Sequence, residues 1–234
     1  MFKMFKNFQL SLFVNQTIAK QKILLYKLFL KLLFSIIFSF LMWVSAESFF
    51  YLPFTPVPIT MQVFTVLLSA ILLGKNWAFF SQCFYISMGF YGLPVFAGFK
   101  NAYTAIPGPT GGYIIGFLLS AYITGMLFEK SKNNKNFNLN LNNQPSYKLN
   151  QINKTDFLKN EKIYLFFCCF AGLMVIYITG YLHLFLYFYN SGKFFDIIDL
   201  LIKTFKLGVY PFIIFDLIKI LFITSIYKTL KLRY

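Results

Sequence analysis

Charged residues are scarce in this chain of 234 amino acids, since Asp, Glu, Lys and Arg make up only 12% of it. Soluble globular domains carry roughly 25% charged residues. Here 58% of the residues are hydrophobic, and 33 Phe and 16 Tyr are among them. The composition therefore argues against a soluble domain and predicts one polytopic bundle of membrane helices.

Acidic residues are the scarcest charged type, with 7 Asp and Glu against 22 Lys and Arg. A net charge of +15 would suit a nucleic-acid partner. The basic residues, however, flank apolar stretches and form no groove-like cluster. We therefore expect a lipid bilayer as the environment and no nucleic-acid partner.

Residues that carry chemistry are also rare. The chain has one His, and its three cysteines, Cys83, Cys168 and Cys169, lie inside apolar runs without a CxxC pair. Such cysteines are typical of apolar packing. Phosphate-loop, HExxH and GxSxG motifs are absent. We expect no metal, no cofactor, no ATP hydrolysis by this chain and no enzyme activity.

Apolar segments close to the ~20 residues that cross a bilayer recur along the chain. They predict an all-α membrane protein with six transmembrane helices, at about residues 26–51, 59–74, 76–93, 111–129, 162–189 and 209–228. Four helices fall in residues 26–129, and the last two fall in residues 162–234.

The remaining segments have distinct compositions. Residues 1–25 are basic and predict a cytoplasmic arm, whereas residues 130–161 are rich in Asn and Lys and predict a disordered, low-complexity insert. Residues 190–206 alternate apolar and charged blocks, which predicts an amphipathic helix on the outer surface or, alternatively, a lid.

The distribution of basic residues predicts the orientation. With the N-terminus in the cytoplasm, 17 Lys and Arg fall on the cytoplasmic side and 4 on the outer side. Cytoplasmic loops carry the excess of Lys and Arg in membrane proteins. Both termini are therefore expected in the cytoplasm, and the TPVPIT segment at residues 55–60 is expected to face outward.

Two ionisable residues lie inside the last predicted helix. Asp216 and Lys219 are three positions apart and so share one helix face. Ionisable groups inside a membrane are expensive, which makes them a functional-site hypothesis. The alternative is a self-neutralising pair that only fixes the helix against its neighbours. His183 is interpreted as a packing or hydrogen-bonding residue.

Three blocks make a more specific pattern. PFTPVPITMQVFTVLLSAILLG, FYISMGFYGLPVFAG and GPTGGYIIGFLLSAYITG occur in this order, and YPFIIFDLIKILF follows at residues 210–222. In order and spacing they resemble the BioY family, the biotin-binding S components of energy-coupling factor (ECF) transporters. The resemblance covers roughly residues 45–128 and 162–228. The chain departs from the family at Ser35 and Ser39, where alanines are usual.

The resemblance implies a site for biotin, which offers ureido N–H donors, a carboxylate and an apolar ring. Such a ligand requires a hydrogen-bond acceptor, a cation and apolar walls. Pro56 and Pro58 would pre-order the loop at the outer mouth of that site. The expected biotin-binding residues are Asp216, Lys219, Thr60, Gln62, Tyr113, Asn101 and Phe54, and Tyr91 is a further candidate wall.

The resemblance also implies partners in the plasma membrane: a transmembrane coupling subunit and two ATPase subunits. Small residues permit close helix contacts, so Ser35, Ser39 and Ser45 are a candidate partner surface, although serines also pack ordinary helices. Two other functions stay open. One is an S component or carrier for another small vitamin, and the other is a non-transport membrane scaffold or enzyme.

Overall fold

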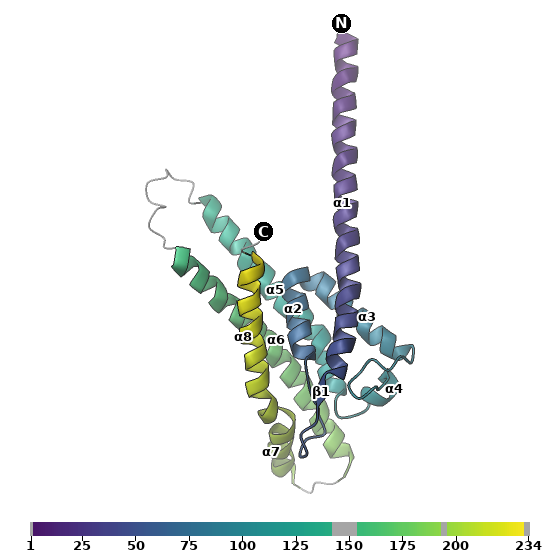
Figure 1. Cartoon of the computed structure of the whole chain (residues 1–234), viewed down its shortest axis with the longest axis vertical. Coiled ribbons are helices and arrows are strands. Elements are labelled where there is room, and N and C mark those ends of the chain that lie inside the picture. Colours follow the sequence, from purple (N-terminus) through teal and green to yellow (C-terminus); the bar gives the residue numbers. More distant parts are fainter. Residues whose placement is uncertain (1, 142–153, 193–195, 232–234) are drawn as a thin grey trace.

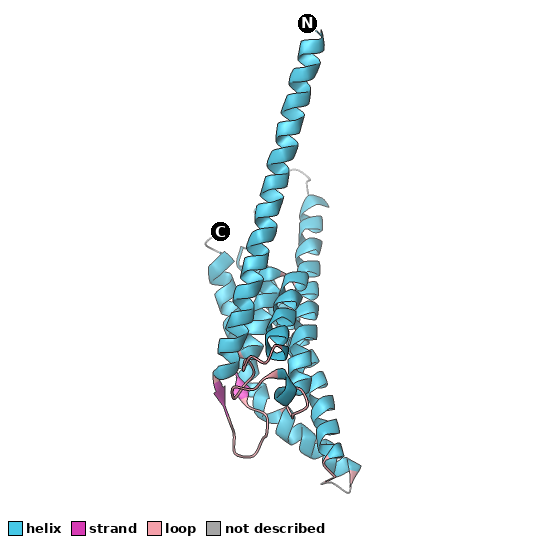
Figure 2. Cartoon of the chain, turned by 90° about the vertical axis from the view of Figure 1, so that its right-hand side faces the viewer, coloured by secondary structure: helices cyan, strands magenta, loops and turns pink. Residues whose placement is uncertain are grey.

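Helices make up most of the computed structural model, which describes residues 2–141, 154–192 and 196–231. Two short antiparallel strands form a ribbon in which Phe49 lies opposite Thr60. The first residues of the first helix and the last residues of the final helix lie toward one end of the bundle, and the ribbon lies toward the other (Figures 1 and 2). The elements are α1 (Phe2–Glu47), β1 (Phe49–Phe50), β2 (Ile59–Thr60), α2 (Gln62–Leu73), α3 (Lys75–Phe90), α4 (Ala102–Ala105), α5 (Gly111–Leu141), α6 (Lys154–Asn190), α7 (Ile197–Gly208), the 3-10 turn η2 (Tyr210–Phe212) and α8 (Ile213–Lys231).

Four helical segments among the described residues are long and apolar enough to cross a membrane: Lys20–Glu47, Gly111–Ser131, Lys162–Asn190 and Ile197–Tyr227. An all-α polytopic membrane fold is thereby confirmed. Helices α2 and α3 have only 12 and 16 residues and meet at Gly74. At 1.5 Å per residue they span about 18 and 24 Å, less than the ~30 Å of a hydrocarbon core. Six separate crossings therefore stay a prediction.

Helix α1 is longer than expected. Residues 2–25, predicted as a separate arm, continue the first membrane helix without a break. The reason is local, because no Gly or Pro occurs before Pro53. Gly and Pro are the residues that most strongly oppose helix propagation, and extending an existing helix is far easier than starting one.

The predicted insert at residues 130–161 is likewise helical at both ends. Helix α5 continues to Leu141 and helix α6 begins at Lys154. The structure thus gives helix in these two stretches, where disorder was expected, and no Gly or Pro lies between Gly125 and Pro145 to end α5 earlier. That residues 130–161 are a low-complexity cytoplasmic insert stays a prediction. Residues 142–153 lie outside the described part of the chain.

The serines of α1 hold this helix against α3. Ser39 Oγ donates to the Ser81 carbonyl at 2.7 Å, and Ser35 Oγ donates to the Trp77 carbonyl at 3.1 Å. Both serines are fully buried, and Ser45 is nearly so. The hypothesis that these three serines form a surface for a partner is therefore wrong. Their small side chains instead let α1 approach α3 at Ser35 and Ser39, and α2 at Ser45, whose Oγ lies 2.6 Å from Thr65 Oγ1.

The GPTGGY block, residues 108–113, allows α5 and α6 to pack closely. A methyl group on Gly112 would collide with the Thr179 carbonyl of α6, and one on Gly111 would collide with the Ile106 carbonyl. His183 Nε2 lies 3.1 Å from that same Ile106 carbonyl, so the interpretation of His183 as a hydrogen-bonding residue is confirmed. Glycine at both positions thus allows the loop before α5 to lie directly against α6.

Candidate ligand-binding site

A partly enclosed cavity lies toward the ribbon end of the bundle, between α2, α5, α6, α8 and the loops at that end. About 50 Å³ of it is open to the centres of water-sized molecules, which is room for a few waters. Most of its wall is apolar, and a few polar groups converge within it. The lining residues are Val57, Pro58, Ile59, Thr60, Gln62, Val63, Phe96, Ala97, Thr110, Tyr113, Ile114, Phe117, Ile176, Tyr177, Phe212, Asp216 and Lys219.

An ion pair on α8 forms one side of the cavity. Lys219 Nζ lies 2.7 Å from Asp216 Oδ1, one turn along the same helix. The two residues are only 8% and 3% exposed. Removing two charges from water is expensive, and their attraction offsets this only when further hydrogen bonds satisfy the remaining polar atoms.

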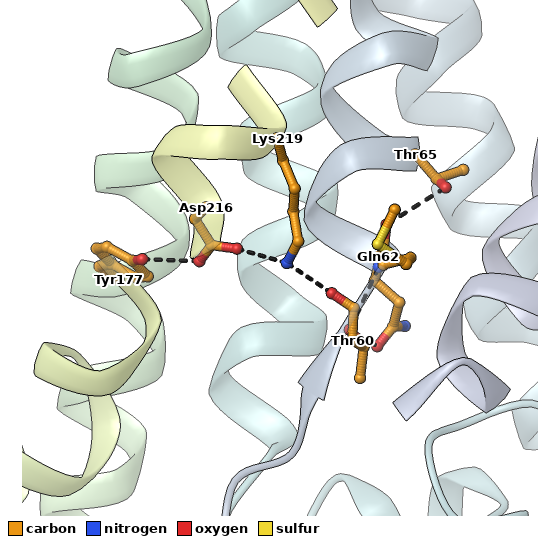
Figure 3. Close-up of polar contacts among 7 residues, drawn as sticks. Thr60, Gln62, Thr65, Tyr177, Asp216 and Lys219 are labelled. Atoms are coloured by element: carbon orange, nitrogen blue, oxygen red, sulfur yellow. Dashed lines mark hydrogen bonds and ion pairs between the residues drawn. The ribbon is translucent and has the colours of Figure 1, made fainter. Parts of the chain in front are cut away.

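Both charged groups have such a second partner. Tyr177 Oη of α6 donates to Asp216 Oδ2 at 2.7 Å. Lys219 Nζ donates to the Thr60 carbonyl of β2, also at 2.7 Å. Figure 3 shows the resulting row, which runs from α6 through α8 to β2. Each charged group therefore has a partner besides the other, and the pair links three elements that are far apart in the sequence.

A second row of hydrogen bonds starts at the same threonine. Thr60 Oγ1 donates to Gln62 Oε1 at 3.1 Å, and Gln62 Nε2 donates to Tyr85 Oη at 2.9 Å. Tyr85, which is fully buried, donates in turn to the Val95 carbonyl at 2.9 Å. The row fixes the loop that brings Phe96 to the cavity wall.

Tyr113 fixes another part of the wall. Its Oη donates to the Gly208 carbonyl at 2.6 Å, at the end of α7. Thr55 Oγ1 donates to the neighbouring Leu207 carbonyl, also at 2.6 Å. The amphipathic helix, predicted from residue 190 and observed from Ile197, thereby connects to the TPVPIT segment. A rigid TPVPIT segment is useful at this position because two of its residues, Val57 and Pro58, line the cavity.

Five of the seven expected site residues meet around this cavity: Asp216, Lys219, Thr60, Gln62 and Tyr113. The other two do not line it. Asn101 instead caps α4, because its Oδ1 accepts from the Thr104 amide at 3.2 Å. Phe54 is 58% exposed and Tyr91, the further candidate, is 87% exposed.

Tyr177 is a site residue that the sequence did not indicate, and it bonds directly to the ion pair. It is one of 16 tyrosines and lies in an apolar helix without a neighbouring motif. Its position opposite Asp216 follows from the packing of α6 on α8, which is a contact between distant segments. No spacing along the sequence predicts such a pairing.

The cavity offers a carboxylate acceptor, an ammonium donor and apolar walls, and the described residues hold no cluster of His, Cys, Asp or Glu fit for a metal. These groups suit reversible binding of a small molecule with an anionic group and N–H donors. Fold and cavity together define a multi-pass membrane protein with an internal site for a small solute.

The chain belongs to the BioY family, whose sequence model matches residues 18–234. It is 33% identical over 189 residues to the biotin transporter BioY of Thermotoga maritima, which covers 81% of this chain and 86% of that protein. It is 32% identical over 164 residues to the probable biotin transporter BioY of Pyrococcus horikoshii, covering 70% and 74% respectively.

A solved structure supports the fold independently. The crystal structure of the S-component for biotin from an ECF-type ABC transporter superposes with a TM-score of 0.64. The match covers 88% of this chain and 93% of the other, at 21% sequence identity. At that identity the likeness concerns the arrangement of the helices.

Proposed function

We propose that this protein captures biotin for uptake across the plasma membrane, as the ligand-binding subunit of an energy-coupling factor transporter. The observation that carries the proposal is the match to the Thermotoga maritima biotin transporter over most of both chains. The buried Asp216–Lys219 pair in a cavity with apolar walls supplies the complementary chemistry.

Each of the two charged residues can bind a different group of biotin. Its ureido N–H groups can donate to the Asp216 carboxylate, and its own carboxylate can accept from the Lys219 ammonium. Tyr113 supplies a wall, and Thr60 and Gln62 supply polar contacts near the ion pair. Asn101 and Phe54 act elsewhere, in the α4 cap and the outer loop.

The cavity must widen before biotin enters. Sites for small molecules have volumes of roughly 300–1,000 Å³, whereas about 50 Å³ is open here. We propose that the segment from Val57 to Thr60 moves as one rigid unit, because a two-residue ribbon and the bond from Lys219 to the Thr60 carbonyl tie it to its neighbours. We propose that biotin's carboxylate replaces this carbonyl as the partner of Lys219.

We further propose six crossings with both termini in the cytoplasm. The described ends of α1 and α8 lie toward the same end of the bundle, in keeping with this arrangement (Figure 1). The excess of basic residues on that side, 17 against 4, favours it. In this proposal the residues between α5 and α6 are cytoplasmic. A coupling subunit with two ATPases drives uptake, because this chain has no phosphate-loop motif of its own.

Calorimetry on the detergent-purified protein tests the proposed function. Biotin should bind at one site per chain, and biotin already bound should suppress the heat of any competing vitamin. A folded, monodisperse protein that binds a different vitamin and leaves biotin in solution would overturn the assignment.

Tyr177→Phe is expected to weaken biotin binding about fivefold, because Asp216 Oδ2 loses a donor and a hydrogen bond contributes about 1 kcal/mol. Isothermal calorimetry measures the change. The control is Tyr103→Phe, which removes from the exposed Tyr103 of α4 a hydroxyl that donates to the Phe90 carbonyl at the end of α3. Equal biotin affinity in both variants would mean that Tyr177 does not position the carboxylate.

A further inference from the structure

An apolar slot runs along the outside of the bundle where α6, α7 and α8 meet. Its volume is about 460 Å³, and its walls are apolar side chains that include Leu173, Phe205 and Val209. Tyr177 separates the slot from the cavity of the candidate site, since it lines both. The slot is therefore distinct from the site proposed for biotin.

The slot opens onto the surface that faces the membrane interior. Ile178 and Leu182 on its rim are 57% and 56% exposed. The neighbouring Ile214 and Ile218 of α8 are 69% and 58% exposed. Side chains of this kind in a membrane-spanning helix lie against lipid chains, so hydrocarbon is the medium at the mouth of the slot.

One end of the slot carries a positive charge. Past Tyr181 and Phe205, which line both spaces, lies a second hollow that also includes Lys206 and Tyr210. This hollow adjoins α7, whose residues Ile197, Ile198, Leu201 and Ile202 are exposed. An amphipathic helix of this kind lies at the membrane interface, where Lys and Tyr meet lipid headgroups.

We propose that the slot and the hollow together bind one phospholipid with an anionic headgroup. An acyl chain lies in the slot between α6 and α8, and the phosphate lies at Lys206. The apolar slot matches the acyl chain of a lipid, and the hollow with Lys206 matches its anionic headgroup. An acyl chain gains little free energy when it moves from the bilayer into an apolar slot. The charge of Lys206 therefore provides the selectivity for an anionic headgroup.

Native mass spectrometry in mild detergent tests the proposal without biotin, so its result is independent of the proposed function. Phosphatidylglycerol and phosphatidylcholine with identical chains are the two probes. The wild-type protein should retain one phosphatidylglycerol and prefer it. Lys206→Gln should reduce this preference about fivefold, and Ile178→Trp should reduce retention of both lipids by filling the mouth of the slot.

Matched variants serve as controls. Lys100→Gln removes the same charge from a loop that does not line the hollow, and Ile214→Trp adds the same bulk beside the slot. Both should retain lipid as the wild type does. Equal retention of the two lipids, unchanged retention in Ile178→Trp, or a dimer without bound lipid would overturn the proposal, and the dimer would assign this face to a second copy of the chain.

Discussion

Asp216→Asn and Lys219→Met are each expected to weaken biotin binding by about tenfold or more while the protein stays folded. Each change weakens or removes a proposed ligand contact and also leaves the other member of a buried pair without an opposite charge. In Asp216→Asn, Lys219 keeps only neutral acceptors, among them the Thr60 carbonyl. Isothermal calorimetry measures binding, and size-exclusion chromatography with thermal unfolding checks the fold.

The double variant Asp216→Asn/Lys219→Met separates stability from binding. It removes both charges together, so its unfolding temperature should exceed that of the less stable single variant, while biotin binding stays lost. Asp199→Asn and Lys75→Met make the same chemical changes at more exposed positions and should bind biotin normally. Wild-type affinity in Asp216→Asn and Lys219→Met would place the site elsewhere.

Ser35→Leu/Ser39→Leu is expected to prevent stable folding. Both serines are fully buried against α3, and leucine has no room there. Overpacking costs about 1–3 kcal/mol at each position, and each lost hydrogen bond costs about 0.5–1.5 kcal/mol. The sum is comparable with the whole stability of many proteins, about 5–15 kcal/mol. Yield of monodisperse protein and the unfolding temperature are the measurements.

Two further variants show whether size or hydrogen bonding matters at these serines. Ser35→Ala/Ser39→Ala keeps the small side chains and should lower the unfolding temperature only modestly. Phe40→Leu/Val44→Leu places leucine on the exposed face of the same helix and should change little. A Ser35→Leu/Ser39→Leu protein that folds and binds biotin, yet no longer co-purifies with a coupling subunit, would restore the partner-surface hypothesis.

The sequence predicted the parts of the site that depend on local spacing. Asp216 and Lys219 share a face because three residues make nearly one turn, and the structure places both in the cavity wall. The Pro56–Pro58 segment was expected at the mouth of a site, and Pro58 lines the cavity. The membrane class followed from composition alone.

The remaining parts depend on contacts between distant segments. Asn101 looked available as a ligand contact, but the backbone of the short helix α4 engages its side chain. The serines of α1 suggested a partner surface, but which way a helix faces is decided by its neighbours, and here α3 covers them. The length of α1 was underestimated because charge marked the predicted boundary, whereas a helix ends at Gly, Pro or a cap.

The narrowness of the cavity would also set the rate at which biotin binds. In the proposed entry the bond between Lys219 and the Thr60 carbonyl opens first, so we expect association slower than diffusion and a rate that levels off at high biotin concentration. The measured dissociation constant is then the intrinsic one divided by the fraction of open molecules. A substitution that loosens the Val57–Thr60 segment would therefore tighten the apparent affinity without touching the ligand.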